Sequence, residues 1–187
     1  MPAVAAKPLK AARFKPPGIG STWVYAHSDG KTERLERIDN SSWGTTGIVR
    51  YRRELDGEPT EIRCYNLRMG TWVVTFDEAE VPIIAADPDD RRYRWPMAFN
   101  GYWRSRYTIR DLRAERNLIA HASWRVDGFE RISIPGGTTR AIRLASNKTS
   151  RDSMVWFAWD IGIRTQVQIF KDGEMVREKT LIDFSPI

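Results

Sequence analysis

Two segments of the chain interleave arginine with aromatic residues, a combination that binds nucleic acid through charge and ring stacking. They are residues 91–95, Arg-Arg-Tyr-Arg-Trp, and residues 103–107, Trp-Arg-Ser-Arg-Tyr. In the second segment, strict alternation puts Arg104, Arg106 and Arg110 on one face of a strand and the large apolar residues on the other. A half-buried strand with a solvated face has this pattern, whereas stacking would need rings and cations on the same face. The sequence therefore predicts an exposed basic surface at these three arginines and disfavours nucleic-acid binding.

Residues that could carry catalysis or bind metals are few and scattered. Cys64 is the only cysteine, and its strand-like surroundings favour a small buried side chain over a nucleophile. The histidines, His27 and His121, lack any metal-ligand spacing. The acidic residues at 87–90 lack the glycine and glutamate of a calcium loop, and the carboxylates at 77–80 cannot be placed about a substrate. We therefore predict no enzyme, no metal site and no cofactor.

Tryptophan is abundant, with eight residues in a chain of 187. On the concave side of a curved sheet, such side chains form either a ligand cavity or a packed core. An open cavity would suit an apolar ligand such as an acyl chain, whereas a packed core would leave a pure interaction module. The candidates for this concave side are Trp23, Trp72, Trp103, Tyr107, Trp124 and Trp156.

These side chains must be positioned by strands, because turn signals recur and no stretch sustains a helical period. Asp-Gly pairs at 29–30, 56–57 and 172–173 and a Pro-Gly-Gly turn at 135–137 separate alternating segments,. The best helical stretch, residues 111–122, fits a strand continuing into a loop equally well. We predict a mainly β protein with little helix, in which a single antiparallel sheet of roughly ten strands curls into a barrel, half-barrel or sandwich. Strands are expected at residues 23–27, 32–38, 47–55, 60–67, 72–76, 102–110, 124–134, 140–146, 154–159, 163–170 and 175–184.

Residues 1–18 are basic, rich in proline and non-periodic, so we predict a disordered tail at 1–18 and a single β-rich domain at 19–187. Residues 3–6, Ala-Val-Ala-Ala, have the small side chains of a secretory cleavage site,. We expect an exported protein whose signal peptide is not part of this sequence. The net charge of +6 favours an anionic partner or serves solubility alone,. No run approaches the roughly 18 apolar residues of a spanning helix, which predicts no transmembrane segment.

Four short motifs carry a resemblance to a known family. Residues 18–25 contain Gly-x-x-Trp-x-Tyr, and residues 96–103 contain spaced Pro, Phe, Gly and Trp. Residues 134–144 read Ile-Pro-Gly-Gly-Thr-Thr-Arg-Ala-Ile-Arg-Leu, and residues 156–162 form an aromatic strand ending in glycine, with Trp159 where proline is usual. Together they resemble the TapB-like bacterial envelope domains of unknown function, whose shape is similar to the half-barrels of lipoprotein carriers. The resemblance implies a half-barrel in the periplasm or at the cell envelope, with no known cofactor.

The sequence thus predicts a non-enzymatic exported domain of the periplasm or cell envelope that binds an apolar or lipid-like ligand or a protein partner. The basic tail and the basic surface would then face an anionic envelope surface. One alternative is a pure protein-interaction or assembly module with a packed core. A second, disfavoured by the alternation of Arg and aromatic residues, is a nucleic-acid-binding protein.

Overall fold

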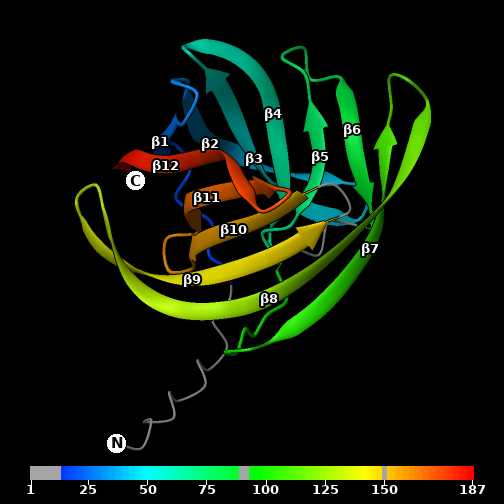
Figure 1. The fold of residues 1–187 in the computed structure, drawn as a ribbon. Helices are drawn as coiled ribbons and strands as arrows, with labels where there is room; N and C mark the ends of the chain where they lie inside the picture. Colours follow the sequence, from blue (N-terminus) through cyan, green and yellow to red (C-terminus); the bar gives the residue numbers. More distant parts are fainter. Residues whose placement is uncertain (1–13, 89–92, 149–150) are drawn as a thin grey trace, which may run out of the picture.

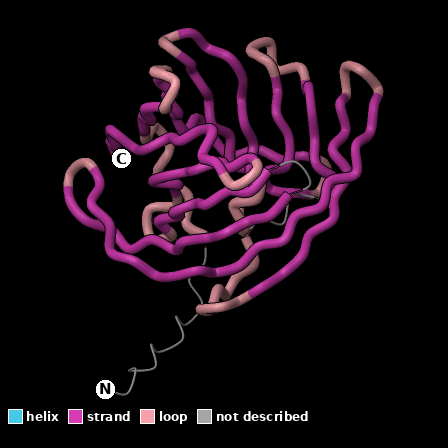
Figure 2. Tube along the Cα trace, in the orientation of Figure 1, coloured by secondary structure: helices cyan, strands magenta, loops and turns pink. Residues whose placement is uncertain are grey.

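The computed structural model describes residues 14–88, 93–148 and 151–187, and these form twelve antiparallel strands. Each strand pairs with the next along the chain, and β12 pairs with β1, which closes the sheet into a barrel (Figure 1). The described residues contain no helix (Figure 2), and therefore none long and apolar enough to cross a membrane. The mainly β prediction is confirmed. The strands are β1 Thr22–His27, β2 Thr32–Trp43, β3 Thr46–Leu55, β4 Glu58–Asn66, β5 Trp72–Phe76, β6 Pro82–Asp87, β7 Tyr102–Asp111, β8 Arg116–Ile134, β9 Gly137–Lys148, β10 Arg151–Ala158, β11 Ile163–Lys171 and β12 Glu174–Ser185.

Two of the three predicted Asp-Gly pairs make two-residue hairpin turns, whereas the pair at 29–30 lies in a four-residue connection between β1 and β2. In the β3–β4 turn, Asp56 and Gly57 have φ angles of 52° and 86°. In the β11–β12 turn, Asp172 and Gly173 have φ angles of 53° and 86°. Both central residues thus adopt the left-handed conformation of a two-residue turn, which matches the twist of the strands it joins.

Two parts of the sheet differ from the sequence expectation. β6 was not predicted, because its apolar run shows no alternation and leads into the Asp87-Pro88 loop. The strand nevertheless pairs with both β5 and β7. Residues 111–122 form no helix, since β7 ends at Asp111 and β8 begins at Arg116, which pairs with it. Of the twelve strands, β6 is the one that has no counterpart among the expected strand ranges.

The two faces of the sheet bury apolar side chains in different places. The main core lies inside the barrel and includes Trp23, Tyr51 and Phe157. A second, smaller cluster lies on the opposite face of β3 to β6, where Cys64 and Val74 are fully buried. The outer cluster stiffens one side of the barrel, and the inner core fills the end of the barrel at which Phe14, the first described residue, packs.

The segment of residues 14–18, here called the terminal strap, crosses that end of the barrel. Phe14 is only 8% exposed and joins the main core. Gly70 and Gly162 leave room for the strap, since a Cβ on either would overlap Phe14 or Lys15. Part of the predicted tail is therefore packed, which the non-periodic, proline-rich sequence did not indicate. The rest of that tail, with the small residues at 3–6, lies outside the described residues, as do 91 and 92 of the first Arg/aromatic segment.

Candidate functional site

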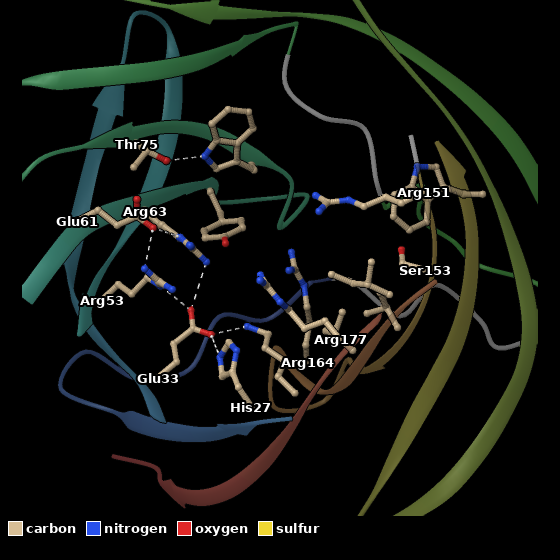
Figure 3. A pocket seen from close by; sticks show the side chains of 17 residues that line it. His27, Glu33, Arg53, Glu61, Arg63, Thr75, Arg151, Ser153, Arg164 and Arg177 are labelled. Atoms are coloured by element: carbon tan, nitrogen blue, oxygen red, sulfur yellow. Dashed lines mark hydrogen bonds and ion pairs between the residues drawn. The ribbon is translucent and has the colours of Figure 1, made fainter. Parts of the chain in front are cut away.

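The part of the barrel interior not filled by the main core holds a cavity of about 390 Å³, here called the basic cavity (Figure 3). Six of its lining side chains are cationic and two are carboxylates, which leaves a formal excess of four positive charges. The lining residues are His27, Glu33, Arg53, Glu61, Arg63, Tyr65, Trp72, Thr75, Trp124, Arg151, Ser153, Val155, Arg164, Val167, Ile169, Arg177 and Lys179.

One wall of the basic cavity is organised around Glu33, which is 1% exposed. Its carboxylate oxygens accept hydrogen bonds from donors on four different strands: Arg53 Nε at 2.7 Å, Lys179 Nζ at 2.8 Å, His27 Nε2 at 3.0 Å and Arg63 Nη1 at 3.3 Å. A buried carboxylate needs such donors, because burial without them would cost several kcal/mol. We call this group the Glu33 wall.

The carboxylate of Glu33 stays ionised because of the cationic side chains around it. Burial alone would raise the pKa of Glu33, but the charges of Lys179 and Arg63 and the hydrogen bonds from Lys179 and Arg53 hold it well below its usual value,. Burial lowers the pKa of Lys179 to about 8; the attraction of Glu33 opposes this shift, and the charge of Arg164 adds to it. Glu33 is thus a permanent internal counter-ion, whereas Lys179 can lose its proton just above neutral pH.

The facing wall carries three guanidinium groups that form no ion pair with any carboxylate among the described residues. They belong to Arg151 of β10, Arg164 of β11 and Arg177 of β12, and Figure 3 shows them directed into the same open space. We call this group the arginine wall. The contacts of Arg164 are with tyrosines. Its Nε donates to the Tyr93 hydroxyl at 3.0 Å, and its guanidinium lies 6.0 Å from the centre of the Tyr65 ring.

Aromatic and apolar side chains complete the lining. Trp72 Nε1 donates to Thr75 Oγ1 at 3.0 Å, which fixes its ring, and Trp124 is 1% exposed. Val155, Val167 and Ile169 add an apolar strip on β10 and β11. The basic cavity therefore offers both a cationic surface and an apolar one.

Access to the basic cavity is from the end opposite the terminal strap. At the strap end, the Tyr93 and Phe157 rings stack at 4.6 Å and Phe14 covers Phe157 at 6.2 Å. At the other end, Arg151 is the first residue of β10 and Arg177 follows the β11–β12 turn, and both are exposed. The arginine wall thus runs from the rim to the depth of the cavity.

The six predicted concave-side residues fall into three groups. Trp72 and Trp124 line the basic cavity. Trp23, Trp103 and Tyr107 are buried on the inward face, at positions that do not line this cavity. Trp156 instead lies on the outer face and donates from Nε1 to Glu130 at 3.1 Å, because its neighbours Val155 and Phe157 take the inward positions of β10,.

The predicted basic surface lies on the outside of β7. Arg104, Arg106 and Arg110 are exposed, while Trp103 and Tyr107, which alternate with them, are buried. Arg104 Nε donates to the Tyr102 hydroxyl at 2.8 Å. This surface is separate from the arginine wall, which faces inward.

The Glu33 and arginine walls were not predicted from the sequence. Their members are dispersed, as the hydrogen bond between Lys179 and Glu33 spans 146 positions. One signal was available in the sequence. Glu33 is two residues before Leu35, and Lys179 is two residues before Leu181, so each charge shares a strand face with a buried leucine,. A charge on the apolar face of a strand indicates a polar interior.

Metal-binding and nucleophilic chemistry find no support in the part of the chain that the structure describes. It contains no group of three or more His, Cys, Asp or Glu side chains that could hold a metal ion. Cys64 is buried as expected, and burial raises the pKa of its thiol to about 12. A thiol of that pKa is protonated at neutral pH and is a poor nucleophile.

The sequence matches no protein-family model and none of the curated proteins. Solved structures do share its fold. A candidate exported protein with a YmcC-like fold from Bacteroides fragilis aligns with a TM-score of 0.55 at 10% identity, covering 92% of this chain and 99% of that one. A candidate lipoprotein from Parabacteroides distasonis aligns with a TM-score of 0.51 at 10% identity and the same coverage. The hypothetical lipoprotein YmcC from Escherichia coli aligns at 12% identity with a TM-score of 0.49, covering 89% of this chain and 85% of that one.

These alignments assign the chain to the fold class of YmcC-like β-barrels. They do not name the TapB-like domains, so that resemblance stays a prediction. The half-barrel that it implied is here a closed barrel.

Proposed function

We propose that this protein is a non-enzymatic binding protein of the cell envelope that holds a small ligand inside its barrel. The basic cavity carries the proposal: its volume of about 390 Å³ lies in the range of small-molecule sites,. A protein that needed only stability would fill this space with apolar side chains, because clustered buried charges cost free energy. The cost is understandable if the cavity serves a ligand.

The proposed location is supported by the two structures of highest TM-score reported above, which are described as an exported protein and a lipoprotein. The small residues at 3–6, which resemble the end of a secretory signal, point the same way,. Periplasmic placement is part of the proposal.

The lining also bears on the kind of ligand. A purely apolar acyl chain would leave the part-buried guanidinium of Arg164 with little water and with no carboxylate partner among the described residues, which is unfavourable,. The lining supports a ligand with both polar and apolar parts better than the purely apolar ligand expected from the tryptophans alone. It also argues against the alternative of an interaction module with a fully packed core. The exposed arginines of β7 remain a proposed contact for an anionic envelope surface, supported by their exposure.

Native mass spectrometry of the protein purified from cell envelopes tests the proposed function. Val167→Trp would fill the basic cavity from its apolar strip, whereas Val176→Trp adds the same bulk at a position that is 58% exposed. We expect a bound small molecule in the wild type and in Val176→Trp, and none in Val167→Trp. Equal occupancy in all three proteins, or a wild type that carries and binds no small molecule, would contradict the proposal.

A further inference from the structure

The charges of the described residues that line the basic cavity do not balance. Arg53 and Arg63 contact both carboxylates of the lining: Arg53 lies 2.7 Å from Glu33 and 3.6 Å from Glu61, and Arg63 lies 3.3 Å and 2.6 Å from them. Lys179 shares Glu33 with these arginines. Both carboxylates of the lining are therefore already used on the Glu33 wall, and the arginine wall has no carboxylate partner in the part of the chain that the structure describes.

Arg164 is the member of the arginine wall that most needs one. Its side chain is part-buried, its Nε is used by Tyr93, and its remaining donors face the cavity. Neither of its contacts is a carboxylate: one is a hydrogen bond to the Tyr93 hydroxyl, and the other is with the ring of Tyr65. A guanidinium with few water contacts and no anion is an unfavourable arrangement that a bound anion would relieve.

The cations also repel one another across the cavity. The charges of Arg164 and Arg63 both lower the pKa of Lys179, after burial and against the attraction of Glu33. These three side chains border one space, since they also line a smaller cavity of about 50 Å³ next to the basic cavity. An anion placed between them would convert mutual repulsion into three favourable contacts.

From this geometry we infer that the basic cavity is an oxyanion site, in which a phosphate or carboxylate group of the ligand binds Arg164, with Lys179 beside it and Arg177 and Arg151 toward the rim. This inference rests on the proposed function and gives it a ligand class. Arginine suits the role because its planar fork binds two oxygens of a phosphate or carboxylate at once.

The remainder of the ligand is small and has an apolar part. The oxyanion would lie between the two walls, and the apolar strip of Val155, Val167 and Ile169 borders the same space. A closed barrel with one end covered by the terminal strap admits a compact molecule. We therefore expect an organic phosphate ester or carboxylate with a ring or short chain.

Calorimetric titration with defined probes tests the inference. The probes are phenyl phosphate, inorganic phosphate, benzoate and neutral phenol, at about physiological salt to screen surface charges. The variant is Arg164→Gln, and the control is Arg104→Gln, which removes the same charge from the outside of β7. Arg164→Lys keeps the charge without the fork and serves as the second variant if Arg164→Gln does not fold.

We expect the wild type to bind phenyl phosphate or benzoate more tightly than phenol, and the ranking of the two anions identifies the ligand's acidic group. Arg164→Gln should lower the affinity for the preferred anion by about tenfold to a hundredfold, the usual effect of losing a hydrogen bond to a charged group. The affinity of Arg164→Lys should lie between those of the wild type and Arg164→Gln. The affinity of Arg104→Gln should stay within about twofold of the wild type.

Equal losses in Arg164→Gln and Arg104→Gln would overturn the inference, because they would show nonspecific attraction. If phenol bound as tightly as the anions and Val167→Trp abolished its binding, the inference of an oxyanion ligand would be wrong. The proposed function would still stand, because a small molecule would bind inside the barrel. Failure of every probe, together with no co-purified small molecule, would overturn both.

Discussion

The two walls of the basic cavity both carry cationic side chains, but they differ in how those charges are compensated. On the Glu33 wall, one carboxylate accepts hydrogen bonds from four donors, and each donor has an anionic partner. On the arginine wall, three guanidinium groups have no carboxylate partner among the described residues. The difference indicates that the first wall maintains the barrel and the second is kept for a ligand. Each prediction below changes one wall and leaves the other intact.

The largest effect is expected on the Glu33 wall. Glu33→Gln would leave the charge of Lys179 without its carboxylate partner and would leave Arg53 and Arg63 with Glu61 alone. This should lower the free energy of unfolding by about 3–5 kcal/mol. Denaturant unfolding measures it. The control is Glu36→Gln on the same strand, whose contacts with Arg34 and Arg52, both at 3.5 Å, are partly solvated and worth about 1 kcal/mol or less. If both variants lost the same small amount, the Glu33 wall would not be the structural one.

The stabilisation by the ionised Glu33 carboxylate should be lost gradually as the pH falls. The pKa of Glu33 is lowered in the folded protein from an ordinary value of 4.5, so its stabilisation is complete above that value and is lost as the pH falls toward the folded pKa. The difference in unfolding free energy between wild type and Glu33→Gln should therefore be constant from about pH 7 to 5 and should shrink below about pH 4. Denaturant unfolding at each pH checks this, and a difference that began to shrink at pH 6 would contradict it.

Base should weaken anion binding through Lys179. Its pKa of about 8 means that it is charged below that pH and loses its charge as the pH rises through it. Oxyanion affinity should therefore fall by roughly tenfold between about pH 7 and 9.5, the effect of one charged contact. Phenyl sulfate is the suitable titrant because its own charge is constant over this range. In Lys179→Arg the affinity should stay flat, since a guanidinium keeps its proton; a parallel fall in that variant would rule Lys179 out as the cause.

The smallest effect is expected at the rim of the arginine wall. Arg177 is exposed and its charge is screened by water, so Arg177→Gln should weaken the preferred oxyanion only about two- to fivefold. The unfolding free energy should change by less than about 0.5 kcal/mol, as for other surface positions. Titration calorimetry and denaturant unfolding measure the two quantities. If Arg177→Gln lost more oxyanion affinity than Arg164→Gln, the anion would have to bind at the mouth of the cavity instead of in its depth.

Local rules predicted most of the fold. Alternation placed Arg104 and Arg106 outside β7, and the Asp-Gly pairs at 56–57 and 172–173 formed the expected hairpins. β6 escaped because a short apolar run beside a proline carries no alternation. A closed barrel was one of three predicted architectures, and the sequence did not choose among them because closure depends on the pairing of β1 with β12, which are at opposite ends of the sequence.

The site was less predictable than the fold. Counting aromatic residues identified Trp72 and Trp124 in the cavity lining but said nothing of its charge. The Glu33 wall requires the register of four strands to be known, because Glu33 on β2 meets Lys179 on β12 only after closure. Arg164 could not be distinguished from other arginines, since the absence of a carboxylate partner among the described residues depends on which side chains surround it in space.

The most direct test of the central claim is to locate an oxyanion in crystals grown with selenate, whose selenium gives an anomalous signal. The account predicts a peak inside the barrel within hydrogen-bond distance of Arg164, present in the wild type and absent in Arg164→Gln. A peak confined to the outer arginines of β7, or an empty basic cavity in crystals whose mouth is open to solvent, would contradict the assignment of the arginine wall as the ligand site.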